Sequence, residues 1–104
     1  MLEIRPQETL FLQKGVVLHS IPREDWYYAF NVDTGDQFQL NGSSFWILET
    51  LGSGVRWERL TDAFLKEYEV ESTTGREDLA RAVSEFIEQG LVGRHADADD
   101  QEAV

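Results

Sequence analysis

Cysteine is absent from this 104-residue sequence, and long apolar runs are missing as well. Without thiols the chain has neither disulfides nor thiolate metal sites, which fits a reducing compartment. No apolar stretch approaches the roughly 20 residues that a membrane-spanning helix needs. The first residues show no basic segment followed by an apolar one, so no signal peptide is readable. We therefore expect a cytoplasmic protein with no membrane partner.

Basic residues are also scarce, since nine Lys and Arg face 20 Asp and Glu and give a net charge of −11. Proteins that bind nucleic acids neutralise phosphates with Lys and Arg, so this balance argues against a nucleic-acid partner. The last ten residues hold no Lys or Arg and four acids, which are Asp97, Asp99, Asp100 and Glu102. We expect one folded domain over residues 1–94 and an acidic, disordered tail over residues 95–104.

The few motifs that could carry catalysis have simpler structural interpretations. The tripeptide Asp33-Thr34-Gly35 matches the active site of aspartic proteases, but that chemistry needs two carboxylates that share a proton in an all-β dimer. A hairpin turn is favoured instead. His19 and His95 lack the spacing of metal ligands, and we expect a half-exposed strand position for His19. His95 with the acids after it could hold a metal weakly, but a disordered tail is favoured. We predict no enzyme activity, no catalytic residue, no metal and no cofactor.

Three segments show the alternation of β-strands. The first spans residues 10–21, with Gly15 as a bulge or bend, and the second spans residues 26–32. The third is short, covers residues 37–40, and directs Phe38 and Leu40 to the core. These segments predict a three-stranded antiparallel meander within residues 10–40.

Three helical segments follow, over residues 42–51, 56–68 and 75–89. Asn41 is a candidate N-cap of the first helix, and Thr74 with Glu77 forms a candidate capping box for the third. Gly52 and Gly90 end the first and third helices. Strands followed by helices indicate the α+β class, with a three-helix, winged-helix-like bundle after the meander. The predicted buried residues are Trp46 or Ile47, Leu48, Phe64 and Phe86.

Two features predict a surface for another chain. The short third strand is placed at a sheet edge, where its backbone could pair with an added strand. The third helix has an apolar arc of about 160°, wider than the roughly 100° that covers one side of a core. Ala80, Ser84 and Ile87 form one margin of this arc and could line a groove. The alternative is that the whole arc belongs to the core.

The junction of the third strand and the first helix resembles PqqD-like proteins, the leader-peptide recognition domains for ribosomally made, modified peptides. The resemblance rests on a turn, Gly35, Phe38, Leu40-Asn41 and Ser43-Ser44, followed by an apolar helix that ends in Leu51. It continues in the segments Trp57-Glu58-Arg59-Leu60, Phe64-Leu65, Tyr68, Asp78-Leu79, Phe86-Ile87 and Gly90-Leu91-Val92. It covers roughly residues 10–93. One departure is Arg56, where the family usually opens its second helix with Ser or Thr.

The resemblance implies a non-catalytic adaptor that binds the leader of a precursor peptide by β-strand addition. It would present that peptide to a modifying enzyme such as a radical-SAM protein, a peptidase or a cyclase. Arg76 and Arg81 could pair with leader carboxylates. The implied peptide-binding residues are Asp36, Gln37, Phe38, Gln39, Arg76, Ala80, Val83, Ser84 and Ile87. The alternative is a winged-helix DNA-binding transcriptional regulator, which the charge balance disfavours. A small enzyme is the third class, and no set of residues supports it.

Overall fold

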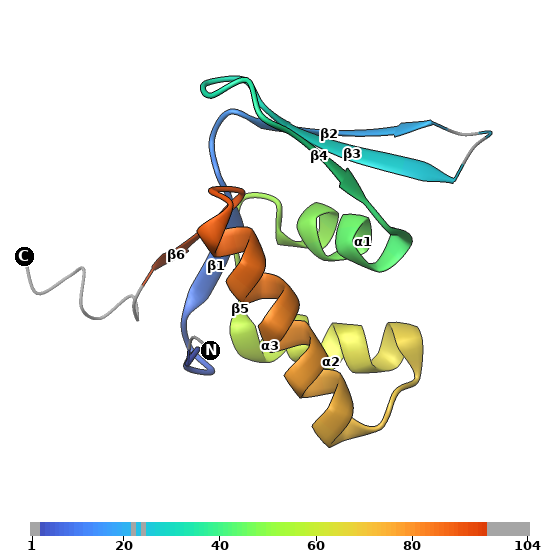
Figure 1. Cartoon of the computed structure of the whole chain (residues 1–104). Helices are drawn as coiled ribbons and strands as arrows, with labels where there is room; N and C mark the ends of the chain where they lie inside the picture. The colour runs from blue at the N-terminus through green and yellow to red at the C-terminus, as the bar shows by residue number, and fades with distance from the viewer. Residues whose placement is uncertain (1–2, 22, 24, 96–104) are drawn as a thin grey trace, which may run out of the picture.

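The computed structural model describes residues 3–21, 23 and 25–95, and it combines two small antiparallel sheets with three helices (Figure 1). The predicted α+β class is confirmed. In chain order the elements are β1 (Thr9–Leu12), β2 (Val16–Ile21), β3 (Trp26–Asn31), β4 (Gln37–Leu40), α1 (Gly42–Leu51), β5 (Val55–Arg56), α2 (Trp57–Tyr68), α3 (Ser72–Glu88) and β6 (Val92–His95).

The predicted meander is the sheet β2-β3-β4. Ala29 of β3 lies opposite Leu18 of β2 and Phe38 of β4, so these three side chains share one face. That face is the core side, because Ala29 is fully buried and Leu40 is 7% exposed. His19 lies on the opposite face and is exposed rather than half-exposed.

Residues 10–21 form two strands in different sheets, not one bulged strand. Gly15 has φ +97°, and Val16 N–H donates to the Gln13 carbonyl at 3.1 Å, so a turn separates β1 from β2. β1 is the central strand of a second sheet in the order β5-β1-β6. The sequence did not predict β5 and β6, because strands of two and four residues are too short to show a clear period.

The helix boundaries agree with expectation at α1 and α2 and differ at α3. Asn41 Oδ1 accepts from Ser44 N–H at 2.8 Å, which confirms Asn41 as the N-cap of α1. No described side chain caps α2 at Arg56. The predicted capping box of Thr74 and Glu77 is wrong. α3 begins at Ser72, and Glu71 Oε2 accepts from Thr74 N–H at 2.8 Å.

The core lies between the sheets and the helices, and every predicted helix has its expected buried residue. Ile47 and Leu48 of α1, Phe64 of α2 and Phe86 of α3 are all at most 8% exposed. α1 packs against the β2-β3-β4 sheet, and α2 packs on α3 farther from it (Figure 1). Across the described ranges, no helix is both long and apolar enough to cross a bilayer.

The chain ends of the described part meet in the second sheet. The predicted tail begins at His95, but His95 is the last residue of β6, and its ring stacks on Phe11 with centroids 4.6 Å apart. Residues 96–104, which hold the rest of that predicted tail, lie outside the described residues.

Candidate peptide-binding site

The backbone of β4 has one side bonded to β3 and one side without a partner among the described strands. Antiparallel strands alternate residues that bond to a given neighbour with residues that do not. Asn31 N–H donates to the Asp36 carbonyl at 2.9 Å, which fixes this alternation. Phe38 and Leu40 therefore bond to β3, and the N–H and C=O groups of Gln37 and Gln39 point outward.

The hydrogen bonds on the other side of β3, toward β2, follow the same alternation. Val32 N–H donates to the Gly15 carbonyl at 2.9 Å, so even-numbered residues of β3 bond to β2 and odd-numbered ones to β4. The same alternation leaves the N–H groups of Val16, Leu18 and Ser20 pointing away from β3. The sheet thus has two open edges among the described residues, β2 and β4, and each offers a row of outward backbone groups.

The side chains of β4 differ between its two faces. Gln37 and Gln39 are exposed on the outer face, and Phe38 is half-buried against the core on the inner face. Asp36 belongs to the turn before β4, where its Oδ2 accepts from Thr34 Oγ1 at 2.9 Å. The stretch Asp33-Thr34-Gly35 is the hairpin turn expected from the sequence, with Gly35 at φ +81°.

The five predicted site residues of α3 lie in three different environments. Ala80 and Ile87 are half-buried, whereas Val83 is fully buried in the core and has no surface to offer a peptide. Ser84 is 8% exposed, and its Oγ has no hydrogen-bond partner among the described residues. Arg76 is exposed in the first half of α3, and its Nε donates to Ser72 Oγ at 3.2 Å.

The arrangement of the elements separates some of the predicted peptide-binding residues from β4. Figure 1 shows the start of α3 at the end of the molecule opposite the β2-β3-β4 sheet, and the end of α3 toward that sheet. Arg76 therefore lies away from β4, and residues near Ile87 lie closer to it. The helix that packs on β4 is α1, which the sequence-based site did not include.

The strongest electrostatic contact lies outside this site. Arg94 of β6 donates from Nε and Nη2 to the two carboxylate oxygens of Glu8, both at 2.7 Å. The hydrogen bond from Arg94 is the main cause that lowers the pKa of Glu8, and the same contact raises the pKa of Arg94. Arg94 Nη2 also donates to the Glu3 carbonyl at 2.9 Å. No motif in the sequence indicated this pair, because 86 positions separate its members.

The described residues hold no cluster of three or more His, Cys, Asp or Glu side chains that could bind a metal ion. Among the described residues, the features left for function are the open backbone edges of β2 and β4. A family model described as "Coenzyme PQQ synthesis protein D (PqqD)" matches residues 27–92, well over half of the chain. The chain belongs to the PqqD family.

The matched segment of this PqqD family member runs from β3 to the start of β6, so it contains β4 and all of α3. The structure is similar to one entitled "TbiB1 in Complex with the TbiA(beta) Leader Peptide". The TM-score is 0.67 at 27% sequence identity, and the alignment covers 84% of this chain and 99% of that one. No curated protein matches the sequence.

Proposed function

We propose that this PqqD family member is a non-catalytic adaptor that binds the leader segment of a precursor peptide as an added strand on β4. The observation that carries the proposal is the open edge of β4, with Gln37 and Gln39 pointing their backbone groups outward. The TbiB1 structure, which contains a leader peptide, supports the same class of partner. Strand addition gives affinity through main-chain bonds and selectivity through the pockets that receive alternate side chains.

The two faces of the added strand would meet different surroundings. Every second side chain would point to the inner face, beside Phe38 and toward α1, which packs on β4. In this proposal Ala80 and Ile87, which are half-buried on α3, supply further apolar surface. The others would lie next to Gln37 and Gln39 on the outer face. Two or three apolar anchors on the inner face would supply most of the side-chain contribution, since exposed ion pairs add only about 0–1 kcal/mol each.

The bound leader would then be presented to a modifying enzyme, such as a radical-SAM protein, a peptidase or a cyclase. An adaptor of this kind needs no catalytic group of its own. It contributes by raising the effective concentration of the precursor near the enzyme, as linked binding modules do. The same proposal places this protein in the cytoplasm, where such peptides are made.

The test uses proline to remove single outward N–H groups. Gln37→Pro and Gln39→Pro each delete a donor on the open side of β4 and leave the bonds to β3 in place. We expect each variant to weaken leader-peptide binding by at least about tenfold, or about 1.4 kcal/mol. Titration calorimetry measures the affinity.

Ser20→Pro is the matched control, because Ser20 also points its N–H outward, but on the β2 edge. It should leave the affinity unchanged. If Ser20→Pro weakens binding and the β4 variants do not, the leader adds to β2. If all three variants bind like the parent protein, strand addition is wrong. Tight binding of duplex DNA without any leader affinity would support the regulator alternative.

A further inference from the structure

Strand β2 has the longest open edge among the described strands, with six residues against four for β4 and for β6. The outward N–H groups of Leu18 and Ser20 have no acceptor in the described part of the chain. Val16 N–H is already committed, since it donates to the Gln13 carbonyl at 3.1 Å. The free outward N–H groups of β2 are therefore those of two alternate residues, Leu18 and Ser20.

This edge lacks the features that usually protect a strand from further pairing. Natural edges are blunted by charged side chains, by proline or by bulges. β2 reads VVLHSI and contains no Lys, Arg, Asp, Glu or Pro. It pairs with β3 in a regular register from Val16 to Ile21, without a bulge. β2 is thus a template for one more strand.

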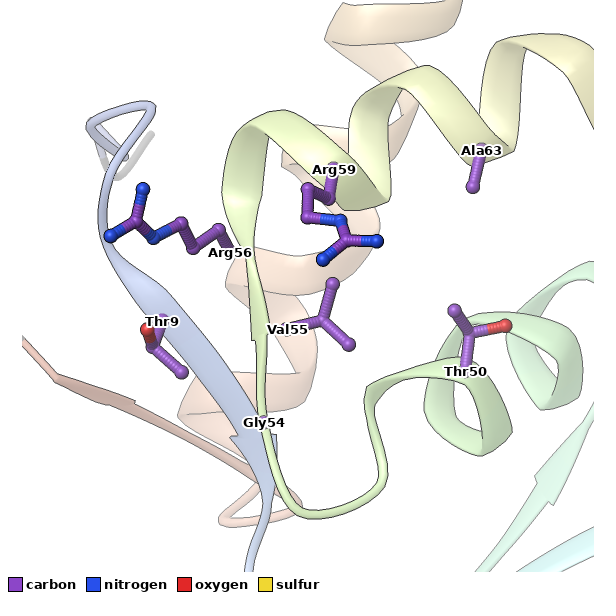
Figure 2. Close-up of a pocket in the computed structure, with 7 residues that line it drawn as sticks. All are labelled: Thr9, Thr50, Gly54, Val55, Arg56, Arg59 and Ala63. Carbon is purple, nitrogen blue, oxygen red and sulfur yellow. The ribbon is translucent and has the colours of Figure 1, made fainter.

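The edges of the other sheet are less suited to pairing. β5 has only two residues, and Figure 2 shows Arg59 of α2 extending over its Val55, beside a groove of about 490 Å³. Arg56, the other residue of β5, is charged and extends on the side of β1. At the β6 edge, Arg94 is held by its contact with Glu8. β2 is therefore the long, uncharged edge that the proposed leader contact at β4 leaves free.

The outer face of β2 and β3 is apolar, and Figure 1 shows the helices on the other side of this sheet. The outer-face residues are Val17, His19 and Ile21 of β2, with Phe30, Tyr28 and Trp26 opposite them on β3. Val17 is 50% exposed and Trp26 is 45% exposed. None of these side chains is Lys, Arg, Asp or Glu, in a chain of net charge −11. Acidic copies of this chain can therefore approach one another through this face and its edge.

We propose that two copies of this chain associate by antiparallel pairing of their β2 strands around a two-fold axis. The two sheets then form one sheet of six strands in the order β4-β3-β2-β2-β3-β4. A two-fold interface uses the same surface of both copies, so the strand has to be complementary to itself.

The free backbone groups select the register. When Leu18 faces Ser20 of the second copy, both residues use their N–H and C=O groups, and the two-fold axis repeats this pair. Val16 needs no partner in this register. When Leu18 faces Leu18 instead, Val16 lies opposite Ser20, and the Val16 N–H that already donates to Gln13 is missing from that pair. The first register is therefore favoured, and at its centre His19 faces His19 of the second copy.

The outer-face side chains match in the same register. Ile21 faces Val17 of the second copy. One row across the joined sheet is then Trp26 and Ile21, followed by Val17 and Phe30 of the second copy. The two-fold axis repeats this row on the other side of His19. Val17, which is half exposed in one copy, thus gains an apolar cross-strand neighbour.

The contact is small, so the dimer should be weak. A strand of six residues is about 20 Å long, and neighbouring strands lie about 4.8 Å apart. A strip of this size falls below the roughly 800 Å² per partner of a stable interface, so we expect dimers that dissociate on dilution. Both β4 edges remain at the ends of the joined sheet. A dimer would therefore carry two leaders, a consequence that rests on the proposed function.

Sedimentation velocity of the full chain between about 1 μM and about 1 mM measures the association. The mean mass should rise toward that of two chains as the concentration increases. Ser20→Pro removes a free N–H and should keep the protein monomeric throughout this range. Ser20→Ala retains that N–H and should associate like the parent protein. Gln39→Pro should also associate, because it alters only the β4 edge, which separates this contact from leader binding.

The absence of cysteine allows a second test, which reports on the register. Facing residues without mutual backbone bonds have Cα atoms about 4.5 Å apart, within the roughly 4.4–6.8 Å of a disulfide. His19→Cys should therefore cross-link two copies under mild oxidation. Val17→Cys is the matched control on the same face. The two Val17 positions are about 13 Å apart along the joined strands, so this variant should cross-link at least about tenfold more slowly.

Four results would overturn the proposal. The first is a parent protein that stays monomeric at about 1 mM. The second is loss of the dimer in Gln39→Pro but not in Ser20→Pro, since β4 would then join the copies. The third is equal cross-linking of His19→Cys and Val17→Cys. The fourth is a monomeric parent protein whose leader affinity falls in Ser20→Pro, because β2 would then take the leader instead of a second copy.

Discussion

Gly75 shows how the absence of one methyl group can position a helix. It lies inside α3, where a Cβ would come within 2.5 Å of Leu65 Cδ2 and 2.6 Å of Val70 Cγ2. Replacing Gly by Ala in a helix interior normally stabilises it by about 0.5–1 kcal/mol. Here we expect Gly75→Ala to gain none of this stability and to lower the free energy of unfolding by up to about 1 kcal/mol, because the side chains of Leu65 and Val70 must move aside to admit the new methyl group.

Urea denaturation followed by circular dichroism measures this change. Glu77→Ala, on the exposed side of the same helix, is the control and should lie within about 0.5 kcal/mol of the parent protein. A more stable Gly75→Ala protein would mean that the side chains of Leu65 and Val70 do not lie against Gly75 as the structure has them.

Phe86 is a second residue whose contribution can be stated in advance. It is 5% exposed and belongs to the cluster that joins α3 to the rest of the core. Phe86→Ala should cost roughly 3–5 kcal/mol through lost burial and the cavity left behind. This would remove much of the roughly 5–15 kcal/mol that holds a domain of this size folded. Val32→Ala, at a position 65% exposed, should barely change the thermal midpoint. A melting curve of Phe86→Ala that coincides with that control would contradict the core assignment.

At the scale of elements, the Glu8–Arg94 pair connects the segment before β1 to β6. Glu8 is 6% exposed as a residue, and its pKa is lowered mainly by the hydrogen bond from Arg94. A carboxyl whose folded-state pKa lies below its unfolded value contributes stability above that unfolded value, near pH 4.5. This contribution is lost as the pH falls from about 4.5 through the lower folded-state pKa.

Glu8→Gln should therefore lower the free energy of unfolding at pH 7 by about 1.5–3 kcal/mol, the usual size of a hydrogen bond to a charged group. The difference from the parent protein should shrink below pH 4.5. Denaturation curves between pH 3 and pH 7 measure both effects. Asp33→Asn, in an exposed turn, is a control for general acid sensitivity. A Glu8→Gln deficit that stays constant with pH would show that the carboxylate charge is not involved.

The elements also show what the sequence could predict and what it could not. Asn41 and Ser44 are three residues apart, so the cap of α1 is a local interaction that the residue types disclose. The cap of α3 was predicted at Thr74 because Thr is a common N-cap, whereas the structure uses the less typical Glu71. β1 and β6 pair residues that are at least 80 positions apart, and no local pattern indicates such a partner.

The same distinction applies to the candidate site. The open edge of β4 followed from a short alternating strand next to a capped helix. The sequence could not show which residues of β4 point their backbone groups outward. That depends on the strand register, which the backbone hydrogen bonds of Asn31 and Val32 fix. Val83 was included because it lies on the apolar arc of α3, but the periodicity of a helix cannot separate a groove margin from the core.

At the scale of the whole molecule, one sheet is built from a continuous segment of the chain and the other from segments that are far apart in the sequence. The β2-β3-β4 sheet uses one continuous segment, residues 16–40, and it carries the proposed leader edge. The β5-β1-β6 sheet collects three distant segments, and the Glu8–Arg94 pair ties the segment before β1 to β6. The proposed leader edge and the Glu8–Arg94 pair thus belong to separate sheets, so each can be disabled by substitutions that leave the other unchanged.

The pairing of β1 with β6 has a consequence for folding during synthesis. The meander is complete once residue 40 has left the ribosome, but β1 must wait for residues 92–95 to gain its longer partner. At roughly 5–20 residues per second, the 52 residues from Asn41 to Val92 take about 3–10 s to translate. Through that interval β1 exposes an unpaired edge, which is a template for wrong pairing with neighbouring nascent chains. Closing the long loop between Leu12 and Val92 also slows the last step, because the conformational entropy of this loop must be lost before the β1–β6 bonds form.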